Sequence, residues 1–305
     1  MIKINRVIII GRGSIAKKHE IILRNIKKNL NILKIKSRNL EKKNKKLIFQ
    51  IKRFNPDYII ISSPATSHYK QMMIIESILI KKVVLIEKPL FDKNYKLPSK
   101  IKNKYFVGYN LRHDPSLIYL KKYLTKKKIF HMSINCSSFL PSWRKNIDYQ
   151  RSVSASRSLG GGVLLELSHE IDYLIWLIGK IKILHVINKK ISNLKINTDD
   201  YFNLNAKSGK TLINISLNFF SRIKRREIII DGNNFSILAD IINGKVIIYE
   251  KKHRIVKSFL KPENYSFKQQ HLNIMKRDYS KLCSLNEGIN VTKLIDKLKF
   301  NSLQR

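Results

Sequence analysis

The sequence predicts an α/β domain followed by an α+β domain whose sheet is mainly antiparallel. In the first part, short apolar runs alternate with longer amphipathic segments, as is typical of βα units around a parallel sheet. After about Pro115, strand-like segments follow one another closely, with hairpin-type links at Ser208-Gly209 and Asn243-Gly244. Because 305 residues exceed the usual size of a single core, we expect two domains, residues 1–115 and 116–305.

The first part contains Ile- and Val-rich runs that predict buried parallel strands covered by helices on both faces. These strands are Arg6 to Ile10, Ile32 to Lys36, Tyr58 to Ser62, Val83 to Glu87 and Tyr105 to Tyr109. Between them, the pattern predicts helices over Ala16 to Lys28 and His68 to Ile80.

The second part alternates apolar and polar residues, which predicts strands with one covered face. The expected strands are Phe130 to Ser137, Ile183 to Lys190, Phe202 to Lys207, Thr211 to Phe219, Arg226 to Asp231, Phe235 to Ala239 and Lys245 to Lys251. The expected helices are Ser116 to Leu124, about Gly162 to Leu177, Ser266 to Cys283 and Asn290 to Asn301.

The formal net charge is +40, which raises the question of nucleic-acid binding. The cations are spread along the whole chain, whereas a binding surface should concentrate them. The denser runs, such as those at 42–46, 126–128 and 224–226, are most simply solvated loops and helix faces. We therefore expect no nucleic-acid partner, and strongly salt-dependent DNA affinity would contradict this expectation.

Two cysteines, Cys136 and Cys283, form neither a disulfide framework nor a metal site by themselves. A reducing cytoplasm is the compartment that suits such a chain. The amino terminus lacks a signal-peptide pattern, and no run of 18 apolar residues is present, so we expect no membrane span.

A glycine turn follows the first predicted strand and opens the first predicted helix. Gly11, Gly13 and Ala16, with Ser14 and Ile15 between them, fit the Gly-x-Gly-x-x-Gly/Ala pattern of dinucleotide-binding proteins. The first glycine permits the tight turn, the second lets the backbone approach a pyrophosphate, and the helix amino terminus faces the phosphates. A glycine turn without a ligand is the simpler alternative.

The end of the second strand distinguishes the two nicotinamide dinucleotides. NAD binding usually places an acid there for the ribose 2′-hydroxyl, but the sequence reads Lys36-Ser37-Arg38-Asn39. Ser37 and Arg38 suit a 2′-phosphate through charge-assisted hydrogen bonds, so NADP is favoured, and NAD stays open. A Lys-rich loop with one chance arginine is the competing interpretation.

Two further strand ends carry polar residues where parallel strands meet ligands. Ser63-Pro64-Ala65-Thr66-Ser67-His68 follows the third strand, and Ser63, Pro64, Thr66 and His68 either line the cofactor cleft or simply cap the next helix. Glu87-Lys88-Pro89 ends the next strand. There Glu87 would lie beside the cofactor, and the Lys88 ammonium could orient a sugar hydroxyl or relay its proton, with a strand-end salt bridge as the alternative.

The helix expected near residues 163–172 carries a possible acid/base pair. Glu166 and His169 share a face at helical spacing, and a carboxylate beside an imidazole can fix its tautomer and raise its pKa. A lone helical histidine is more often structural. The polar groups on this helix, Asp172 among them, indicate that its first half faces a cleft.

Four motifs in this order resemble the Gfo/Idh/MocA oxidoreductase family: Gly11-x-Gly13-x-x-Ala16, Glu87-Lys88-Pro89, Gly108-Tyr109-Asn110-Leu111-Arg112, and Gly160-Gly161-Gly162 with His169-x-x-Asp172. The resemblance spans at least residues 6–179. It implies a Rossmann domain, then an α/β domain whose open sheet covers the cofactor and often supports oligomers. It also implies NAD- or NADP-dependent chemistry on sugars, sugar acids, cyclitols or nucleotide sugars, with Lys88 as the catalytic or substrate-orienting lysine and His169 as the acid/base.

The sequence departs from this family pattern in two places. Many relatives have an aspartate four residues before the histidine, whereas Glu166 stands three before it. The segment 139–144 with Asp148-Tyr149 resembles a branch associated with surface-polysaccharide and acidic-sugar gene clusters. Trp143 could stack on a sugar or simply pack, and Arg144 could bind a carboxylate or phosphate. The full expected substrate set is Asn110, Arg112, Trp143, Arg144, Tyr149, Glu166 and Asp172.

The leading hypothesis is therefore a cytoplasmic, homo-oligomeric NAD(P)-dependent dehydrogenase or reductase of a sugar, sugar acid or nucleotide sugar. Surface-polysaccharide metabolism is its expected context, and we expect no resident metal. The alternative is a nonenzymatic NAD(P)-binding sensor or scaffold that kept the cleft and lost the chemistry. Cofactor binding without hydride exchange across a sugar panel would favour that alternative.

Overall fold

The computed structural model describes residues 4–42, 44–144 and 148–303, and it divides into two compact units. Unit 1 comprises Met1–His113 and Asn264–Thr292, and unit 2 comprises Asp114–Glu263 and Lys293–Arg305. The expected ranges 1–115 and 116–305 differ from this division in two respects. The first boundary lies after His113, and the chain returns after Glu263 to add a segment of 29 residues to unit 1.

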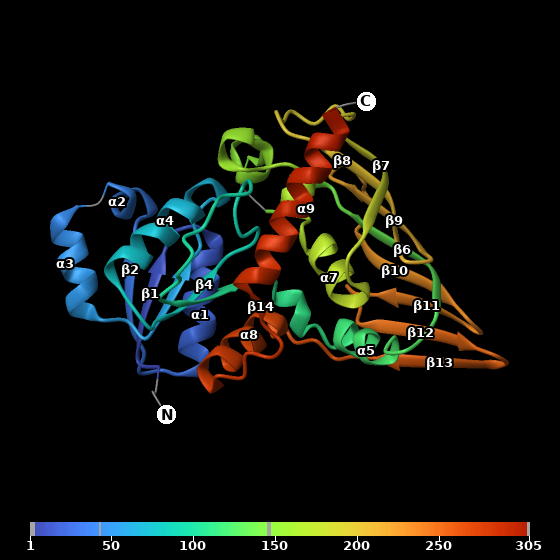
Figure 1. The fold of residues 1–305 in the computed structure, drawn as a ribbon, viewed down its shortest axis with the longest axis horizontal. Coiled ribbons are helices and arrows are strands. Elements are labelled where there is room, and N and C mark those ends of the chain that lie inside the picture. Colours follow the sequence, from blue (N-terminus) through green and yellow to red (C-terminus); the bar gives the residue numbers. More distant parts are fainter. Residues whose placement is uncertain (1–3, 43, 145–147, 304–305) are drawn as a thin grey trace. The chain divides into compact units, whose positions relative to one another are not determined.

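Unit 1 is built on one six-stranded sheet with the order β14-β5-β4-β3-β1-β2 (Figure 1). Its strands are β1 (Arg6–Ile10), β2 (Asn31–Ile35), β3 (Tyr58–Ile61), β4 (Val83–Ile86), β5 (Lys104–Val107) and β14 (Cys283–Ser284). Strands β1 to β5 are parallel, which confirms the predicted α/β fold. Only β14 runs antiparallel, beside β5, and the sequence pattern did not predict it.

The helices of unit 1 follow its strands in the βα manner. They are α1 (Ser14–Ile26), α2 (Ser37–Glu41), α3 (Lys45–Phe54), α4 (Ala65–Ile78), the 3₁₀ turn η1 (Asn110–His113) and α8 (Tyr265–Lys276). Helix α9 (Leu285–Leu303) begins in unit 1 and continues into unit 2. Helices α2 and α3 were not predicted, and Ile51 is the buried residue of α3. Asn44 begins it by accepting hydrogen bonds from two backbone amides.

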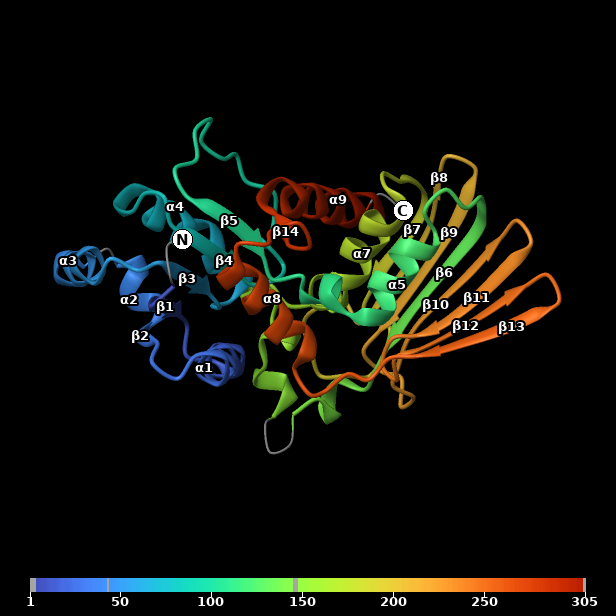
Figure 2. The same ribbon diagram turned by 90° about the horizontal axis from the view of Figure 1, so that it is seen from below.

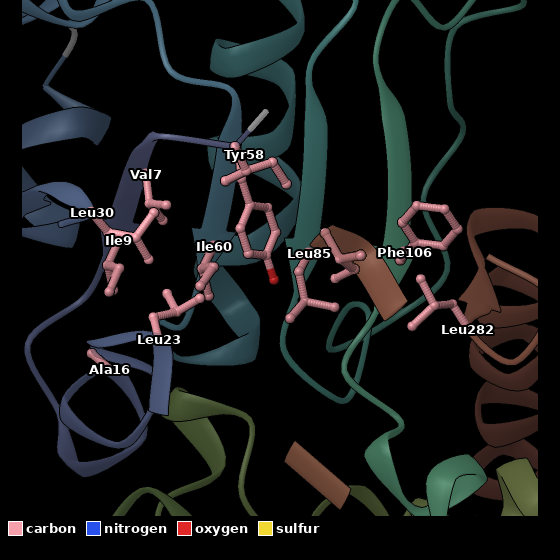
Figure 3. Packing of buried hydrophobic residues seen from close by; sticks show 12 residues of the cluster. Val7, Ile9, Ala16, Leu23, Leu30, Tyr58, Ile60, Leu85, Phe106 and Leu282 are labelled. Carbon is pink, nitrogen blue, oxygen red and sulfur yellow. The ribbon is translucent and has the colours of Figure 1, made fainter. Parts of the chain in front are cut away.

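One apolar layer of unit 1 lies between the sheet and helices α1 and α8. Figure 3 shows Val7, Ile9 and Ile60 of neighbouring strands packed towards Leu23 of α1. Tyr58, at the start of β3, brings a hydroxyl group into this apolar layer and is fully buried. A buried hydroxyl needs a hydrogen-bond partner, and its partner is described below.

Unit 2 is built on one eight-stranded sheet with the order β13-β12-β11-β10-β6-β9-β8-β7 (Figure 2). The strands are β6 (Ile129–Ser137), β7 (Lys182–Lys189), β8 (Tyr201–Ser208), β9 (Thr211–Asn218), β10 (Arg225–Gly232), β11 (Phe235–Asp240), β12 (Lys245–Glu250) and β13 (His253–Ser258). Only β6 and β9 pair in parallel, which confirms the predicted mainly antiparallel sheet. Strand β13 was not predicted.

One face of this sheet carries helices α5 (Pro115–Tyr123) and α7 (His169–Ile178), and the figures show no helix on the other (Figure 2). Side chains alternate accordingly: Ile228 and Ile230 are buried, whereas Ile229 between them is exposed. The short helix α6 (Val163–Glu166) and the 3₁₀ turns η2 (Leu140–Ser142), η3 (Tyr149–Arg151), η4 (Val153–Ala155) and η5 (Arg157–Leu159) complete the unit.

Two helix predictions in the second half of the chain were wrong. The single helix expected from Gly162 to Leu177 is broken, because α6 ends at Glu166 and α7 begins at His169. The helix expected from Ser266 to Cys283 ends at Lys276, where Arg277 adopts a left-handed conformation. Within the described residues, no helix is both long enough and apolar enough to cross a membrane.

We expect Gly161→Ala to lower the free energy of unfolding by about 1–3 kcal/mol. The added methyl group would collide with the backbone carbonyl oxygens of Val153 and Ser154, which are not free to move. Gly13→Ala is the matched control, because a methyl group there meets nothing within 4 Å and its φ of −71° suits any residue. Urea unfolding of both variants measures the difference, and equal stabilities would contradict the packing argument.

Candidate functional site

The carboxyl ends of β1, β3 and β4 lie side by side in unit 1, because these strands are direct neighbours in the sheet. The glycine turn follows β1, Ser62-Ser63 follows β3, and Glu87-Lys88 follows β4. Strand β1 lies between β2 and β3, so the chain order reverses there, and such a switch point is where open α/β sheets bind ligands.

The glycine turn has the geometry that the motif predicts. Gly11 has a φ of +120°, and a methyl group on it would lie 2.7 Å from the carbonyl oxygen of Ser62, so only glycine fits between β1 and β3. Gly13 immediately precedes α1 and faces open space, while Ser14 is exposed, Ile15 half-buried and Ala16 buried. No side chain caps α1, so its first amides remain available to an anion.

Ser37 and Arg38 begin α2 at the carboxyl end of β2. Arg38 is exposed, whereas Ser37 donates a hydrogen bond to Glu41 (3.0 Å). Gln71 of α4 donates to both, at 2.5 Å and 2.8 Å. Burial raises the pKa of the Glu41 carboxyl, but hydrogen bonds from Ser67, Gln71 and Ser37 outweigh burial and lower that pKa. Sequence reasoning overlooked this carboxylate, which stands one helical turn after Ser37.

The loop after β3 is held by hydrogen bonds to its neighbours. Ser63 donates to Gln71 (2.6 Å), Pro64 precedes α4, and Thr66 is half-buried in its first turn. His68 is buried, with Nε2 2.8 Å from the carbonyl oxygen of Ser63 and Nδ1 3.0 Å from that of Pro89. Burial lowers the pKa of His68, although the carbonyl oxygens of Ser63, Leu90 and Pro89 oppose this effect. The ring contacts both this loop and the loop after Lys88.

Glu87 and Lys88 follow β4 directly, and their side chains differ in how far they are exposed to solvent. Glu87 is 6% exposed and accepts hydrogen bonds from His19 Nε2 (3.0 Å) and from the backbone amide of Lys88 (3.3 Å). Lys88 is half-buried, and the Lys88–Pro89 peptide bond is cis. A methyl group on Gly108 would lie 2.7 Å from Glu87 Oε1, so glycine leaves room for the carboxylate. Glu87 is thus an internal anchor, and Lys88 is the more accessible residue of the pair.

Asn110 and Arg112 lie in η1, and both are buried. The Arg112 guanidinium donates to Glu287 Oε1 at 2.5 Å, and Glu287 also accepts two hydrogen bonds from Ser284. Arg112 therefore pairs with a carboxylate of α9 within unit 1. Sequence reasoning did not identify this partner, which lies 175 residues away.

The glycine triplet of unit 2 allows close backbone packing. Gly160 and Gly162 have positive φ angles, and a methyl group on Gly162 would collide with the carboxylate of Asp199. Asp199 in turn accepts a hydrogen bond from the Leu164 amide (3.1 Å), at the start of α6. Burial raises the pKa of the Asp199 carboxyl. The triplet thus fixes where α6 begins.

His169 is the first residue of α7 and is half-buried, as is Glu166 at the end of α6. The break between the two helices removes the continuous helical spacing on which their predicted pairing was based. Asp172 is buried one turn further along α7. The neighbouring Glu170 is fully buried and accepts a hydrogen bond from Arg226 Nε of β10 (2.7 Å), which fixes α7 on the sheet.

Three of the predicted substrate residues lie close together in the segment that follows β6. Trp143, Arg144 and Tyr149 line one small hollow together with Leu140, Pro141, Ser152 and Ser154. Trp143 donates to Ser138 (2.8 Å) and packs edge-on against Phe219, which agrees with its packing interpretation. The hydroxyl of Tyr149 accepts a hydrogen bond from the Lys195 amide (3.2 Å), and Arg144 is exposed. The hollow measures about 10 Å³, room for about one water molecule.

Comparison with known proteins gives a fold likeness and no sequence relative. No family model matches the chain, and no curated protein matches it either. Its fold, however, is similar to that of solved dehydrogenases over nearly the whole length of both chains. Among the described residues, no group of three His, Cys, Asp or Glu side chains could hold a metal ion.

Three solved structures illustrate the likeness. Levoglucosan dehydrogenase in complex with NADH has a TM-score of 0.79 at 14% identity, covering 98% of this chain and 97% of that one. The WlbA dehydrogenase of Bordetella pertussis, in complex with NADH and UDP-GlcNAcA, has a TM-score of 0.73 at 14% identity, covering 99% and 97%. UDP-N-acetylglucosamine 3-dehydrogenase GnnA of Acidithiobacillus ferrooxidans has a TM-score of 0.72 at 14% identity, covering 99% and 98%.

We expect Glu287→Gln to destabilise the protein at pH 7 and to make less difference in acid. Burial raises the pKa of the Glu287 carboxyl, but Arg112 and Ser284 outweigh it and lower that pKa below its ordinary value of 4.5. The ionised form therefore contributes stability above the unfolded pKa of about 4.3, and this contribution is lost as the pH falls through the lowered folded pKa.

Thermal unfolding of both proteins followed by circular dichroism at pH 7 and in acid measures this effect. Glu20→Gln is the control, because Glu20 pairs with the exposed Lys34 at the surface, where solvent weakens the interaction. A difference between wild type and Glu287→Gln that stays constant with pH would contradict the ion-pair argument.

Proposed function

We propose that the protein is an NAD(P)-dependent oxidoreductase of the Gfo/Idh/MocA type that acts on a hydroxyl or carbonyl group of a sugar, sugar acid or nucleotide sugar. The observation that carries the proposal is the glycine turn at the switch point of the sheet, with Lys88 two strands away at the same edge. The likeness to solved sugar and UDP-sugar dehydrogenases over nearly the whole chain supports it.

The nicotinamide dinucleotide is held, in this proposal, by the loops that follow β1, β3 and β4. The amides of Gly13, Ser14, Ile15 and Ala16 bind the pyrophosphate at the uncapped start of α1. Ser63, Pro64 and Thr66 line the next loop, and His68 positions it through its backbone contacts. The chemistry that such a cofactor supplies is hydride exchange with the carbon that bears the reacting oxygen.

The choice between the two dinucleotides depends on α2. Arg38 is exposed at the end of β2 and can pair with a 2′-phosphate, which favours NADP. The ionised Glu41 carboxylate, bonded to Ser37, would repel that phosphate and would suit a ribose 2′-hydroxyl, which keeps NAD open. The dinucleotide named in two of the neighbouring structures is NADH.

Lys88 and His169 carry the proposed chemistry. The Lys88 ammonium orients the reacting sugar oxygen at the carboxyl edge of the sheet. His169 gives or takes the proton of that oxygen, a role that imidazole groups often take in catalysis. Glu87 does not touch the substrate in this proposal, because it is buried beneath Lys88.

In this proposal the substrate is held by residues of η1, of the segment after β6, and of helices α6 and α7. Trp143, Arg144 and Tyr149 share one hollow, which supports a common role for them. Arg144 is exposed and suits a carboxylate or phosphate of an acidic or nucleotide-linked sugar. Asn110, Glu166 and Asp172 complete the proposed set. Arg112 takes a supporting role, because its guanidinium pairs with Glu287.

A homo-oligomer fits the uncovered face of the unit 2 sheet. Ile229, Leu238, Ile247 and Val256 stand opposite one another on the adjacent strands β10 to β13 and form an apolar stripe across that face. A stripe of this kind is typical of a surface that another subunit covers. We propose a cytoplasmic location for the oligomer and a role in surface-polysaccharide metabolism. The sensor or scaffold alternative is not favoured, because the neighbouring structures are dehydrogenases.

We expect Lys88→Ala and His169→Ala each to lower kcat on the order of 10²-fold or more, because each removes a proton-handling or orienting group from the reaction. Turnover is followed by nicotinamide absorbance with a panel of free sugars, sugar acids and UDP-sugars. Lys81→Ala is the control, since Lys81 is exposed beside the opposite end of β4. Absence of any NADH- or NADPH-induced thermal shift in the wild type would refute the proposed function.

We expect Arg38→Ala to weaken NADPH binding on the order of tenfold and to leave NADH binding nearly unchanged, because only NADPH carries the 2′-phosphate. Isothermal titration calorimetry with each cofactor measures both affinities. Arg53→Ala, on the exposed surface of α3, controls for a general loss of positive charge. Equal weakening for both cofactors would remove the NADP assignment.

A further inference from the structure

Four polar side chains form an unbroken chain through the core of unit 1. Tyr58 OH lies 3.1 Å from His271 Nδ1, His271 Nε2 lies 2.9 Å from His19 Nδ1, and His19 Nε2 lies 3.0 Å from Glu87 Oε1. Tyr58, His19 and His271 are completely buried. The chain connects β3, α8, α1 and the end of β4, and it ends on the carboxylate that accepts the Lys88 amide.

The donors and acceptors fit together in one direction. A carboxylate only accepts, so His19 Nε2 carries the hydrogen towards Glu87. In a neutral His19 the Nδ1 atom then accepts from His271 Nε2, and His271 Nδ1 accepts from the Tyr58 hydroxyl. If His19 were an imidazolium, the chain would reverse, and the buried Tyr58 hydrogen would face no acceptor among the described residues. If His19 and His271 are both neutral and carry their hydrogen on Nε2, every donor and acceptor in this series of hydrogen bonds therefore has a partner.

The surroundings favour the same neutral state. Burial lowers the pKa of His271 well below its ordinary value, and a positive charge on His19 or His113, if either ring carried one, would lower it further. Burial raises the pKa of Tyr58 well above its ordinary value, so the phenol keeps its hydrogen, and Glu87 adds to this effect. His113 of η1 is itself neutral, because burial lowers its pKa to about 4. Phe267 of α8 contacts the His19 ring edge-on and adds no charge.

We propose that Tyr58, His271 and His19 are positioning residues that form a one-way hydrogen-bond chain onto Glu87 and thereby fix the backbone of Lys88 at the edge of the sheet. The chain also ties the end of β4 to α1, the helix that follows the glycine turn. It thereby keeps the position of the glycine turn fixed relative to that of Lys88 within unit 1. Only the consequence for turnover rests on the proposed function.

The first experiment observes the rings directly and requires no substrate. Long-range ¹H–¹⁵N NMR of the whole chain labelled at histidine distinguishes Nε2–H, Nδ1–H and imidazolium forms, and His19→Gln and His271→Gln assign the signals. We expect both rings to be Nε2–H tautomers at neutral pH, because this is the arrangement in which every donor of the chain has an acceptor. An imidazolium or an Nδ1–H tautomer at either position in the wild type would overturn the proposal.

The second experiment compares two buried tyrosines. Tyr58→Phe removes the first donor of the chain, whereas Tyr105→Phe removes an equally buried hydroxyl that donates to Glu76 (2.7 Å) outside it. Each variant removes one hydroxyl donor from the interior of unit 1, so a merely structural role predicts the same result for both. We expect only Tyr58→Phe to shift the His271 and His19 nitrogen signals. Identical spectra for Tyr58→Phe and wild type would overturn the proposal.

Turnover separates the inference from the proposed function. We expect Tyr58→Phe to lower kcat about tenfold with an unchanged KM for the nicotinamide cofactor, and His19→Gln, which keeps an N–H donor, to retain more kcat than His19→Leu. Unchanged kcat in an active enzyme would overturn the positioning role and leave the proposed function intact. If the wild type binds no nicotinamide, the proposed function fails, and the NMR result alone decides the inference.

Discussion

Burial of the Glu87 carboxylate is the constraint on which the arrangement of unit 1 depends. An ionised carboxylate inside a protein needs hydrogen-bond donors, because it has lost its water. The donors here are His19 from α1 and the amide of Lys88, and Gly108 leaves the space beside it. The glycine turn, the end of β4 and the loop after β5 are therefore arranged around a single acceptor. Replacing that acceptor by an apolar side chain would leave the His19 N–H unsatisfied.

The return of residues 264–292 to unit 1 follows from the same constraint. This segment supplies His271 to the hydrogen-bond chain, Glu287 to Arg112, and β14 to the edge of the sheet. Each of these contacts satisfies a polar group that the first 113 residues leave open. A chain cut after His113 would therefore lose Glu287 as a partner of Arg112 and His271 as a partner of His19, and it would expose the free edge of β5.

The parallel strands and the glycine turn could be predicted from the sequence because both depend on local patterns, namely runs of Ile and Val and residues with a required φ angle. The break between Glu166 and His169 could not be predicted, because apolar and polar residues recur at helical spacing throughout 163–172, as they would in one continuous helix. Its cause is the packing of α6 on Asp199 and of α7 on Arg226. The His19–His271 contact joins residues 252 positions apart, and no local pattern encodes it.

The distribution of charge explains why so basic a chain can keep this fold. Of the residues that the structure describes, six of the 21 acidic side chains are buried, at Glu76, Glu87, Asp114, Glu170, Asp172 and Asp200, whereas Arg112 is the one buried side chain among the Lys and Arg residues. Carboxylates inside the units accept specific hydrogen bonds, as Asp114 does at the start of α5 and Glu170 does from Arg226. Lys and Arg at the surface need only water. The net charge can therefore rise by substitution at the surface without disturbing the interior, so the value of +40 says nothing about the fold.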